Sequence, residues 1–205
     1  MKAKAWMDHT RDDYLRMIDR QWPFWSALDE FVLANGIRSV VEVGCGIGQL
    51  CFRVDSYVGI DINRSVLSDN ELFYRRGTWL CGDWLAMHGL AGELFLASAV
   101  IEHCESFQVF LEKALTLPHL YAVVTFSKGL REKELIQQHP TGPFHENYYC
   151  RADVEAWLSG KLGTGRWRIY DFPLSRRARQ ARMESVLVID RTGVCQLEMW
   201  SKGAL

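Results

Sequence analysis

A glycine-rich stretch between two apolar runs carries the residues of this sequence that are best suited to bind a ligand. Val40–Val43 is rich in β-branched residues and predicts a buried strand, and the segment Gly44–Gly48, G-C-G-I-G, follows it at once. A second apolar run, Tyr57–Ile60, ends on Asp61. Glycine lets main-chain N–H groups approach a ligand closely, and a carboxylate after the next strand accepts hydrogen bonds from ribose hydroxyls. The arrangement indicates a nucleotide-type site.

The spacing of these residues narrows the class of ligand. A dinucleotide-binding fingerprint requires G-x-G-x-x-G, whereas here the third glycine comes one position early, at Gly48, and Gln49 stands where that fingerprint has glycine. No Gly-Lys-Ser/Thr follows, which excludes a P-loop. Glu42, two positions before the first glycine, is an unfavourable neighbour for a pyrophosphate but suits a cation. A glycine turn in an unrelated α/β protein is the alternative on these residues alone.

The whole pattern resembles a known family. E-x-G-x-G-x-G followed by G-I-D resembles the first two motifs of the class I S-adenosylmethionine-dependent methyltransferases. Gly82-Asp83-Trp84 resembles the triplet of that family that recognises adenine. L-A-S-A-V-I-E-H, ending at His103, resembles the fourth motif of its ubiquinone-biosynthesis-like branch. The resemblance implies a doubly wound, seven-stranded, mostly parallel sheet with an antiparallel last strand.

The same resemblance implies S-adenosyl-L-methionine as the cofactor and gives its contacts roles. Asp61 would accept from the ribose hydroxyls, Asp83 from the adenine amine, and Ser98 would line the methionine part. A turn aspartate at a strand end is the alternative for Asp83. The cofactor-binding residues that the resemblance implies are Glu42, Gly44, Cys45, Gly46, Gly48, Asp61, Ile62, Asp83, Trp84 and Ser98.

The acceptor attacks the sulfonium methyl group in line, so the protein chiefly positions the acceptor, desolvates it and removes its proton. Histidine is the usual general base near neutral pH, which makes His103 the first candidate and His145 the second. A structural hydrogen bond at a helix start is the alternative for His103. The segment from His145 to Asp153 resembles the N-x-Y-S-x-x-D segment that closes many small-molecule methyltransferases, with Cys150 at the capping position. We therefore predict transfer to oxygen or nitrogen of a small-molecule acceptor.

Other functions stay open at this point. Small-RNA 2′-O-methyltransferases use E-x-x-E-H and a distant histidine to hold a divalent metal, but Ala99 stands where the first glutamate would be. The basic cluster Arg176–Arg182 would hold a phosphate or an RNA backbone in an RNA-directed enzyme, or it is a solvated hairpin loop. A non-catalytic or partner-dependent methyltransferase-fold binding protein is a further alternative. The N/D-P-P-Y motif of amino-directed DNA and protein-glutamine enzymes is absent.

Helices are expected to cover this framework, beginning with an N-terminal helix over Thr10–Asn35 that Pro23 kinks or splits. The start of this helix is expected to lie over the cofactor site, where Tyr14 or Arg11 would reach the ligand. Apolar residues recur along it at helical spacing and are expected to be core: Leu15, Ile18, Trp22, Trp25, Leu28 and Val32.

The remaining predicted elements alternate between strands and helices, as in a parallel sheet. The predicted strands are Thr78–Cys81, Leu94–Ala97, Leu120–Phe126, Arg166–Phe172, Ser185–Ile189 and an edge strand over Val194–Trp200. The predicted helices are a short one of about two turns over Gln49–Asp55, one capped by Asn63, Phe107–Leu117 and Ala152–Leu158. Ser127–Tyr149 is expected to be a long loop with one helical turn over Arg131–Gln138.

Length and composition limit the number of domains, the class of partner and the cellular compartment. The 205 residues predict a single domain, with an N-terminal helical segment (1–36), a cofactor-binding half (37–126) and an acceptor-side half (127–205). A net charge of −1 gives no general attraction to nucleic acid or membrane. The start, MKAKAWMDHT, has no apolar core of a signal peptide, and no apolar run approaches the length of a membrane helix. Six cysteines without C-x-x-C predict reduced thiols in a cytoplasmic protein and no zinc site.

Overall fold

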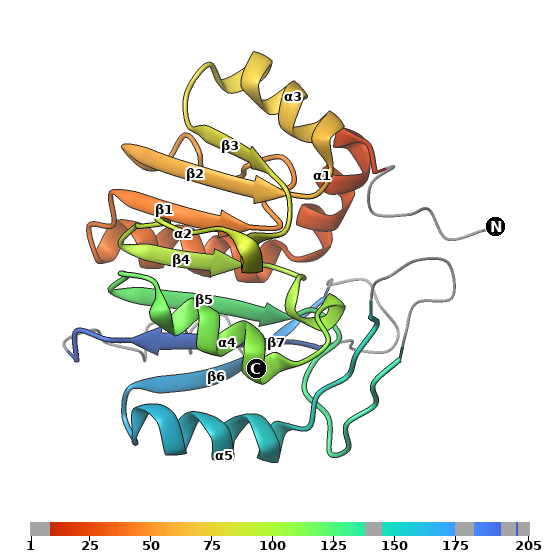
Figure 1. Ribbon diagram of the computed structural model, residues 1–205, viewed down its shortest axis with the longest axis vertical. Helices are drawn as coiled ribbons and strands as arrows, with labels where there is room; N and C mark the ends of the chain where they lie inside the picture. Colours follow the sequence, from red (N-terminus) through yellow and green to blue (C-terminus); the bar gives the residue numbers. More distant parts are fainter. Residues whose placement is uncertain (1–8, 138–144, 175–182, 194–199, 201–205) are drawn as a thin grey trace.

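The protein is described here by a computed structural model that covers residues 9–137, 145–174, 183–193 and 200, and its centre is one seven-stranded sheet (Figure 1). The strand order is β3-β2-β1-β4-β5-β7-β6, with parallel pairing from β3 to β5 and with β7 antiparallel to both of its neighbours. The predicted fold class is therefore confirmed. The strands are β1 (Ser39–Val43), β2 (Ser56–Asp61), β3 (Thr78–Cys81), β4 (Leu94–Ala97), β5 (Tyr121–Phe126), β6 (Trp167–Pro173) and β7 (Met183–Asp190).

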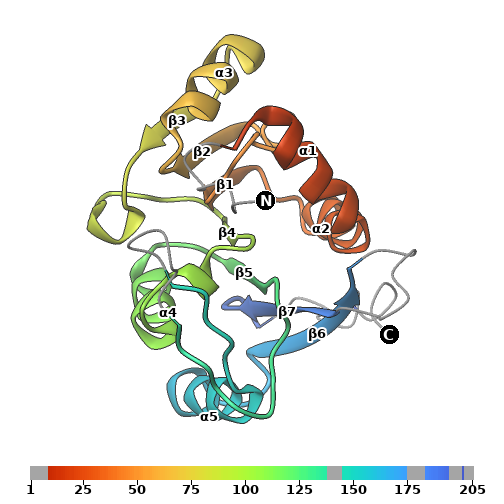
Figure 2. The same ribbon diagram turned by 90° about the vertical axis from the view of Figure 1, so that its right-hand side faces the viewer.

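Helices cover both faces of the sheet, which Figure 2 shows edge-on. Val40 packs in the apolar cluster that contains Phe24 of α2, whereas its neighbour Val41 packs in the cluster that contains Phe110 of α4. Strands buried on both faces read as continuous apolar runs, which is why the sequence revealed them. The first layer holds α1 (Arg11–Arg20), α2 (Trp22–Ala34) and α3 (Arg64–Tyr74), and the second holds α4 (Phe107–Thr116) and α5 (Arg151–Leu162). Two 3₁₀ helices follow β3 and β4, η2 (Trp84–Ala86) and η3 (Ile101–His103).

The N-terminal helix is split at Gln21, as Pro23 predicted. Proline occupies the first turn of α2, where its missing N–H has no helical partner to lose. The apolar stripe is only partly buried. Leu28 of α2 is fully buried, but Leu15 is 48% exposed and Trp22 is 55% exposed, which corrects the expectation that both are core.

No helix connects β1 to β2, which corrects the helix predicted over Gln49–Asp55. Successive turns occupy this segment, closed by hydrogen bonds such as Gly48 N to Cys45 O (2.8 Å) and Cys51 N to Gly48 O (3.0 Å). The five residues of β1 extend about 16 Å at about 3.3 Å per residue, whereas a helix over 49–55 would extend only about 10 Å. A helix of this length would span less than the strand does, and the segment forms successive turns instead.

The segment between β5 and α5 is strand-like where it is described, which corrects the helical turn predicted over Arg131–Gln138. Leu135 and Tyr148 exchange two main-chain hydrogen bonds of 2.8 and 2.9 Å. Cys150 gives α5 no side-chain cap, as predicted for a cysteine at that position. Residues 138–144 of the loop and the cluster Arg176–Arg182 lie outside the described residues, as does the predicted edge strand Val194–Trp200 except for Trp200.

No helix in the described part of the chain has the length and apolar character needed to cross a membrane.

Two glycines with similar backbone angles allow a test of how tightly the first crossover is packed. A Cβ added to Gly36 (φ +59°) would meet nothing within 4 Å, whereas a Cβ on Gly48 (φ +67°) would lie 2.4 Å from Cη2 of Trp79. We expect Gly36→Ala to cost about 1–2 kcal/mol of unfolding free energy from the left-handed backbone alone, and Gly48→Ala to cost clearly more. Urea unfolding of both variants measures the difference.

The double variant Gly48→Ala/Trp79→Leu is expected to recover part of the additional loss, because it removes the ring that a Cβ meets. Equal unfolding free energies for Gly36→Ala and Gly48→Ala would contradict this account of the crossover.

Candidate active site

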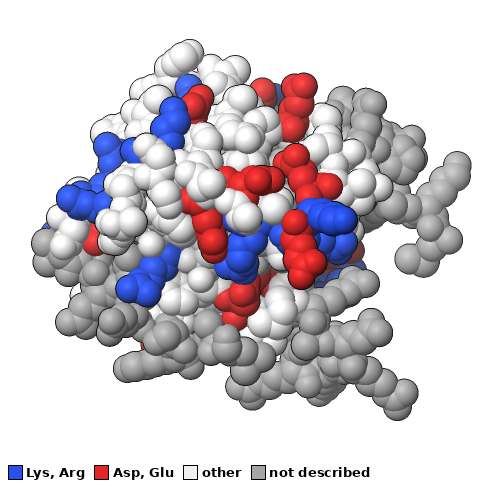
Figure 3. Space-filling model, turned by 90° about the horizontal axis from the view of Figure 1, so that it is seen from below, with Lys and Arg blue, Asp and Glu red and all other residues white. Residues whose placement is uncertain are grey.

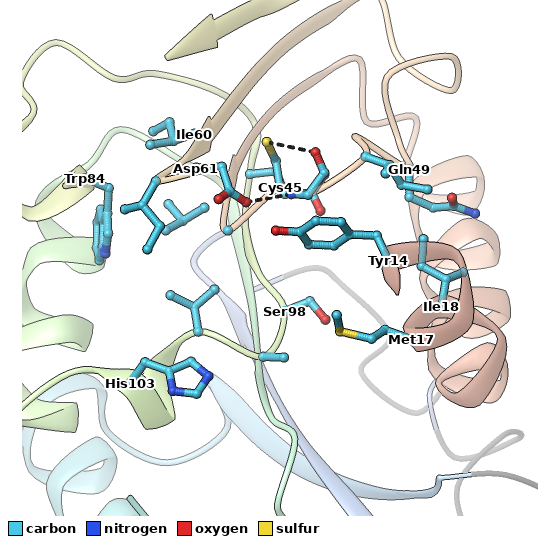
Figure 4. A pocket seen from close by; sticks show the side chains of 18 of the residues that line it. Tyr14, Met17, Ile18, Cys45, Gln49, Ile60, Asp61, Trp84, Ser98 and His103 are labelled. Carbon is cyan, nitrogen blue, oxygen red and sulfur yellow. Dashed lines mark hydrogen bonds between the residues drawn. The ribbon is translucent and has the colours of Figure 1, made fainter. Parts of the chain in front are cut away.

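The C-terminal ends of β1, β2 and β4 meet at a cavity of about 400 Å³, within the range of about 300–1,000 Å³ usual for ligand sites. β2 and β4 lie on opposite sides of β1, which makes this the switch point of the sheet order. Figure 4 shows Tyr14 and Met17 reaching in from α1, with Asp61 at the centre and Trp84 at the far end. Of the predicted cofactor contacts, those that line the cavity are Glu42, Gly44, Cys45, Gly46, Asp61, Ile62, Asp83, Trp84 and Ser98.

Gly48 is the predicted cofactor contact that the structure places elsewhere. It does not line the cavity, and it lies against the ring of Trp79 on the first crossover. In this structure the third glycine of the motif therefore allows close packing against Trp79 and does not contact the cavity.

Gly46, in the middle of the loop, cannot carry a side chain without displacing its neighbour. Its φ is +46°, and a Cβ there would lie 2.5 Å from Cδ1 of Tyr14. Its N–H donates to Oδ2 of Asp61 (2.9 Å), and its carbonyl accepts from Nδ2 of Asn70 (2.7 Å). Hydrogen bonds with Asp61 of β2 and Asn70 of α3 therefore fix the loop, and the ring of Tyr14 packs over it.

Asp61 ends β2 and is only 8% exposed. Its two oxygens accept one main-chain N–H each, Oδ1 from Asn63 and Oδ2 from Gly46, both at 2.9 Å. Burial raises the pKa of Asp61, and these amide donors oppose that rise. Each carboxylate oxygen has a second lone pair, so the side chain can accept further hydrogen bonds from a ligand without leaving the loop.

Asp83 follows the end of the next strand, β3, where it makes the turn contact considered for it and also lines the cavity. Its Oδ1 accepts from the main-chain N–H of Leu85 (3.0 Å), which caps η2, and the residue also lines the cavity. The ring of the neighbouring Trp84 is buried against Phe95 and Phe110. Trp84 is therefore anchored in the core at the far end of the cavity.

The two predicted catalytic histidines lie together but contribute differently. His103 lines the cavity, and its Nδ1 is 2.9 Å from the main-chain carbonyl oxygen of His145. A carbonyl only accepts, so Nδ1 carries the proton, and in the neutral ring Nε2 carries the lone pair. The side chain of His145 does not line the cavity. His103 therefore makes the structural hydrogen bond considered for it and also faces the site.

The N-terminal helices contribute more to the cavity than the sequence predicted. Tyr14 lines it, as expected, but Arg11 instead lies over the ring of Phe73 at 4.3 Å. Ile18 and Trp25 belong to one helical stripe, which is the signal that could have placed them on a common face. Gln21 lies three residues after Ile18 and four before Trp25, so helical spacing could have placed it on the same face, although its polarity kept it out of the apolar stripe. The cavity residues of these helices that were not assigned to the site are Met17, Ile18, Gln21 and Trp25.

The carboxylates of the cavity have no basic counterpart: Glu42, Asp61 and Asp83 line it, and none of its described lining residues is Lys or Arg. Glu42 is 2% exposed, and the hydroxyl of Tyr57 donates to its Oε2 (2.5 Å). Burial raises the pKa of Glu42 to about 8, and the neighbouring Asp61 acts in the same direction. A carboxyl with this pKa is largely protonated at neutral pH, and a positively charged ligand in the cavity would favour its ionised form.

These buried acids predict an unusual dependence of stability on pH. Burial raises the pKa of Glu42 to about 8, of Glu102 to about 7 and of Glu184 to about 8, all from an ordinary value of 4.5. The folded protein therefore binds more protons than the unfolded chain across this range, so its stability falls as pH rises. We expect the thermal unfolding midpoint of the ligand-free protein to fall by several degrees between pH 6.5 and 8.

The substitution Glu42→Gln removes one of these groups, so the unfolding midpoint should fall less steeply with pH. The variant should therefore be more stable than the parent protein at pH 8. Glu112→Gln, at an exposed ion pair with Lys161, is the matched control and should leave the slope unchanged. An unfolding midpoint that rises between pH 6.5 and 8 would refute the assignment.

Comparisons with known proteins give the fold a name. No protein-family model and no curated protein matches the sequence. Magnesium protoporphyrin IX methyltransferase from Synechocystis PCC 6803 with bound S-adenosylmethionine matches 93% of this chain and 86% of its own, at 15% identity and a TM-score of 0.60. The methyltransferase domain of bacterial CtHen1 matches 84% of this chain and 99% of its own, at 15% identity and a TM-score of 0.58.

A third match is the small RNA methyltransferase HEN1, at 14% identity and a TM-score of 0.57 over 84% of this chain and 25% of that one. The matches to these structures extend over 84–93% of this chain. The ubiquinone-biosynthesis-like branch stays a prediction. This chain has the class I methyltransferase fold.

Proposed function

We propose that this protein is an S-adenosylmethionine-dependent methyltransferase that acts on oxygen or nitrogen of a small-molecule acceptor. One observation carries the proposal: the hydrogen bond of 2.9 Å from Gly46 N to Asp61 Oδ2 joins the glycine loop to the acidic end of β2 in the wall of the cavity. The two motifs that resemble the nucleoside site of the family therefore meet in space. The match to a structure that holds S-adenosylmethionine supports the same cofactor.

The residues of the cavity fit this cofactor. Asp61 keeps lone pairs for ribose hydroxyls, and Asp83 lies at the next strand end, as adenine recognition requires. Gly44 leaves main chain bare where a Cβ would lie 2.2 Å from Cγ2 of Val100. The acidic lining suits a sulfonium cation. When bound, S-adenosylmethionine supplies a methyl group that its sulfonium makes electrophilic.

His103 is the residue that we assign to proton removal. Its Nδ1–H is committed to the carbonyl of His145, so the neutral ring is oriented to accept a proton at Nε2. Cavity walls from α1 and η3 would exclude water from the acceptor. For a hydroxyl or an ammonium acceptor, this proton is the one that must leave when the new bond to carbon forms.

We place the enzyme in the cytoplasm. The five described cysteines, Cys45, Cys51, Cys81, Cys104 and Cys150, are all free thiols, which supports a reducing compartment.

An RNA-directed enzyme is the alternative that the match to HEN1 favours. Ala99 has no ligating group, however, and Glu102 is 2% exposed with its Oε1 accepting from the hydroxyl of Ser127. Figure 3 shows acidic and basic side chains mixed on the face around α5, where Lys161 pairs with Glu112 at 2.8 Å. These observations support a small-molecule acceptor.

The non-catalytic alternative is supported by the absence of a helix between β1 and β2. It predicts that the protein binds S-adenosylmethionine without transferring the methyl group.

Cofactor binding is the first test. We expect isothermal titration calorimetry to give a dissociation constant of about 1–100 µM for S-adenosylmethionine, and Asp61→Ala to weaken it at least tenfold, or about 1.4 kcal/mol, because the ribose acceptor and the loop tie are both lost. Asp55→Ala removes an exposed carboxylate paired with Arg38 just before the same strand and should bind like the parent. Absence of binding to the folded parent protein would rule out the proposed function.

The two histidines provide a test of the catalytic assignment. With an acceptor identified by release of S-adenosylhomocysteine, we expect His103→Ala to lower kcat about 10²–10⁴-fold, because the proton acceptor is lost, and to leave cofactor affinity nearly unchanged. His145→Ala keeps the main-chain carbonyl that orients His103 and should retain kcat within about tenfold. A larger loss in His145→Ala than in His103→Ala would reverse the assignment.

A further inference from the structure

Gln21, at the break between α1 and α2, is a polar side chain held in a fixed orientation inside the cavity. It is 9% exposed and lines the cavity between apolar neighbours from the same two helices, among them Ile18 and Trp25. Its Nε2 donates to Oε1 of Glu184 at 2.6 Å, across 163 residues of sequence. The short contact places the amide nitrogen toward β7.

Glu184 is an unusual partner, because it is completely buried in β7 next to Phe172 of β6. Its second oxygen, Oε2, has no hydrogen bond of good geometry among the described residues, although the nearby side chain of Thr125 acts to lower the pKa of Glu184. Burial raises the pKa of Glu184 to about 8, and Glu102 contributes in the same direction. A buried carboxyl with an unmatched oxygen is expensive unless a ligand or a cation compensates it.

This pair determines what the cavity presents at the Gln21 end. The amide nitrogen uses one of its two N–H groups on Glu184, and the carbonyl oxygen of Gln21 is left as a hydrogen-bond acceptor for a ligand. A carboxylate or phosphate group would meet that lone pair, and its charge would oppose ionisation of Glu184 behind it. An ammonium group would meet a hydrogen-bond acceptor, and its charge would favour the ionised form of Glu184.

Resting on the proposed function, we propose that Gln21, held by Glu184, forms an ammonium subsite of the cavity. The ammonium belongs either to the methionine part of the cofactor or to an amine acceptor. Both sources require the same chemistry, a cationic N–H donor directed to Oε1 of Gln21. The subsite would give the enzyme a preference for amine-bearing over anionic ligands at this end.

Two thioether probes test the first source, because S-adenosylhomocysteine carries the amino-acid tail and 5′-methylthioadenosine lacks it. Gln21→Leu removes the carbonyl oxygen, and Glu184→Gln removes the ionisable carboxyl while keeping the shape. If the subsite holds the cofactor ammonium, calorimetry should show both variants binding S-adenosylhomocysteine at least about tenfold more weakly. Binding of 5′-methylthioadenosine should then change less than about twofold.

If the subsite holds the acceptor ammonium, affinity for S-adenosylhomocysteine should be unchanged in both variants. Benzylamine should then bind the S-adenosylhomocysteine-loaded parent protein more tightly than benzyl alcohol does, and the variants should lose that preference. Glu112→Gln is the charge-matched control, and thermal unfolding checks that each variant is folded.

The proposal is overturned if folded variants keep both the affinity for S-adenosylhomocysteine and the affinity for benzylamine. It is also overturned if they lose S-adenosylhomocysteine and 5′-methylthioadenosine equally, which is the result of a distorted cavity. Failure of the parent protein to bind either thioether would instead overturn the proposed function itself, so the two failures are distinguishable.

Discussion

The hydrogen bond between Gly46 N and Asp61 Oδ2 is the contact on which the site depends. It crosses from the loop after β1 to the end of β2 and fixes the distance between the two groups that face a nucleoside. The parallel register of β1 and β2, in which Val43 lies opposite Ile60, brings these two segments to the same edge of the sheet. Everything that packs β1 against β2 therefore also maintains the geometry of the cavity.

The loop needs this tie because no helix follows it. In a longer crossover, a helix would begin at the glycine turn and hold it by its first hydrogen bonds. Here side chains of α3 take that part: Nδ2 of Asn70 donates to Gly46 O at 2.7 Å, and the hydroxyl of Tyr74 donates to Ile47 O at 2.6 Å. Tyr14 of α1 covers the same turn from above. A short crossover and an intact loop are thus compatible.

The electrostatic character of the cavity follows from the same packing. Glu42 and Glu184 lie on different strands, yet both are buried at the edge where the parallel strands end. Neither is paired with a cation among the described groups, so each carries a raised pKa and contributes negative potential when ionised. Burial of these carboxyls lowers the stability of the protein when the site is empty, and it favours the binding of a cationic ligand. Protein stability and ligand binding are therefore linked.

The sequence by itself determined the sheet, because strands buried on both faces appear as apolar runs, and the motifs after β1, β2, β3 and β4 marked their carboxyl ends. It also located the split at Pro23, since proline restricts the backbone locally. The tertiary structure alone decided that turns rather than a helix connect β1 to β2, and that the side chain of Gln21 pairs with Glu184, 163 residues further along the chain. Local sequence patterns predict backbone conformation and burial. Contacts between residues far apart in the sequence depend on tertiary packing, and no spacing in the sequence predicts them.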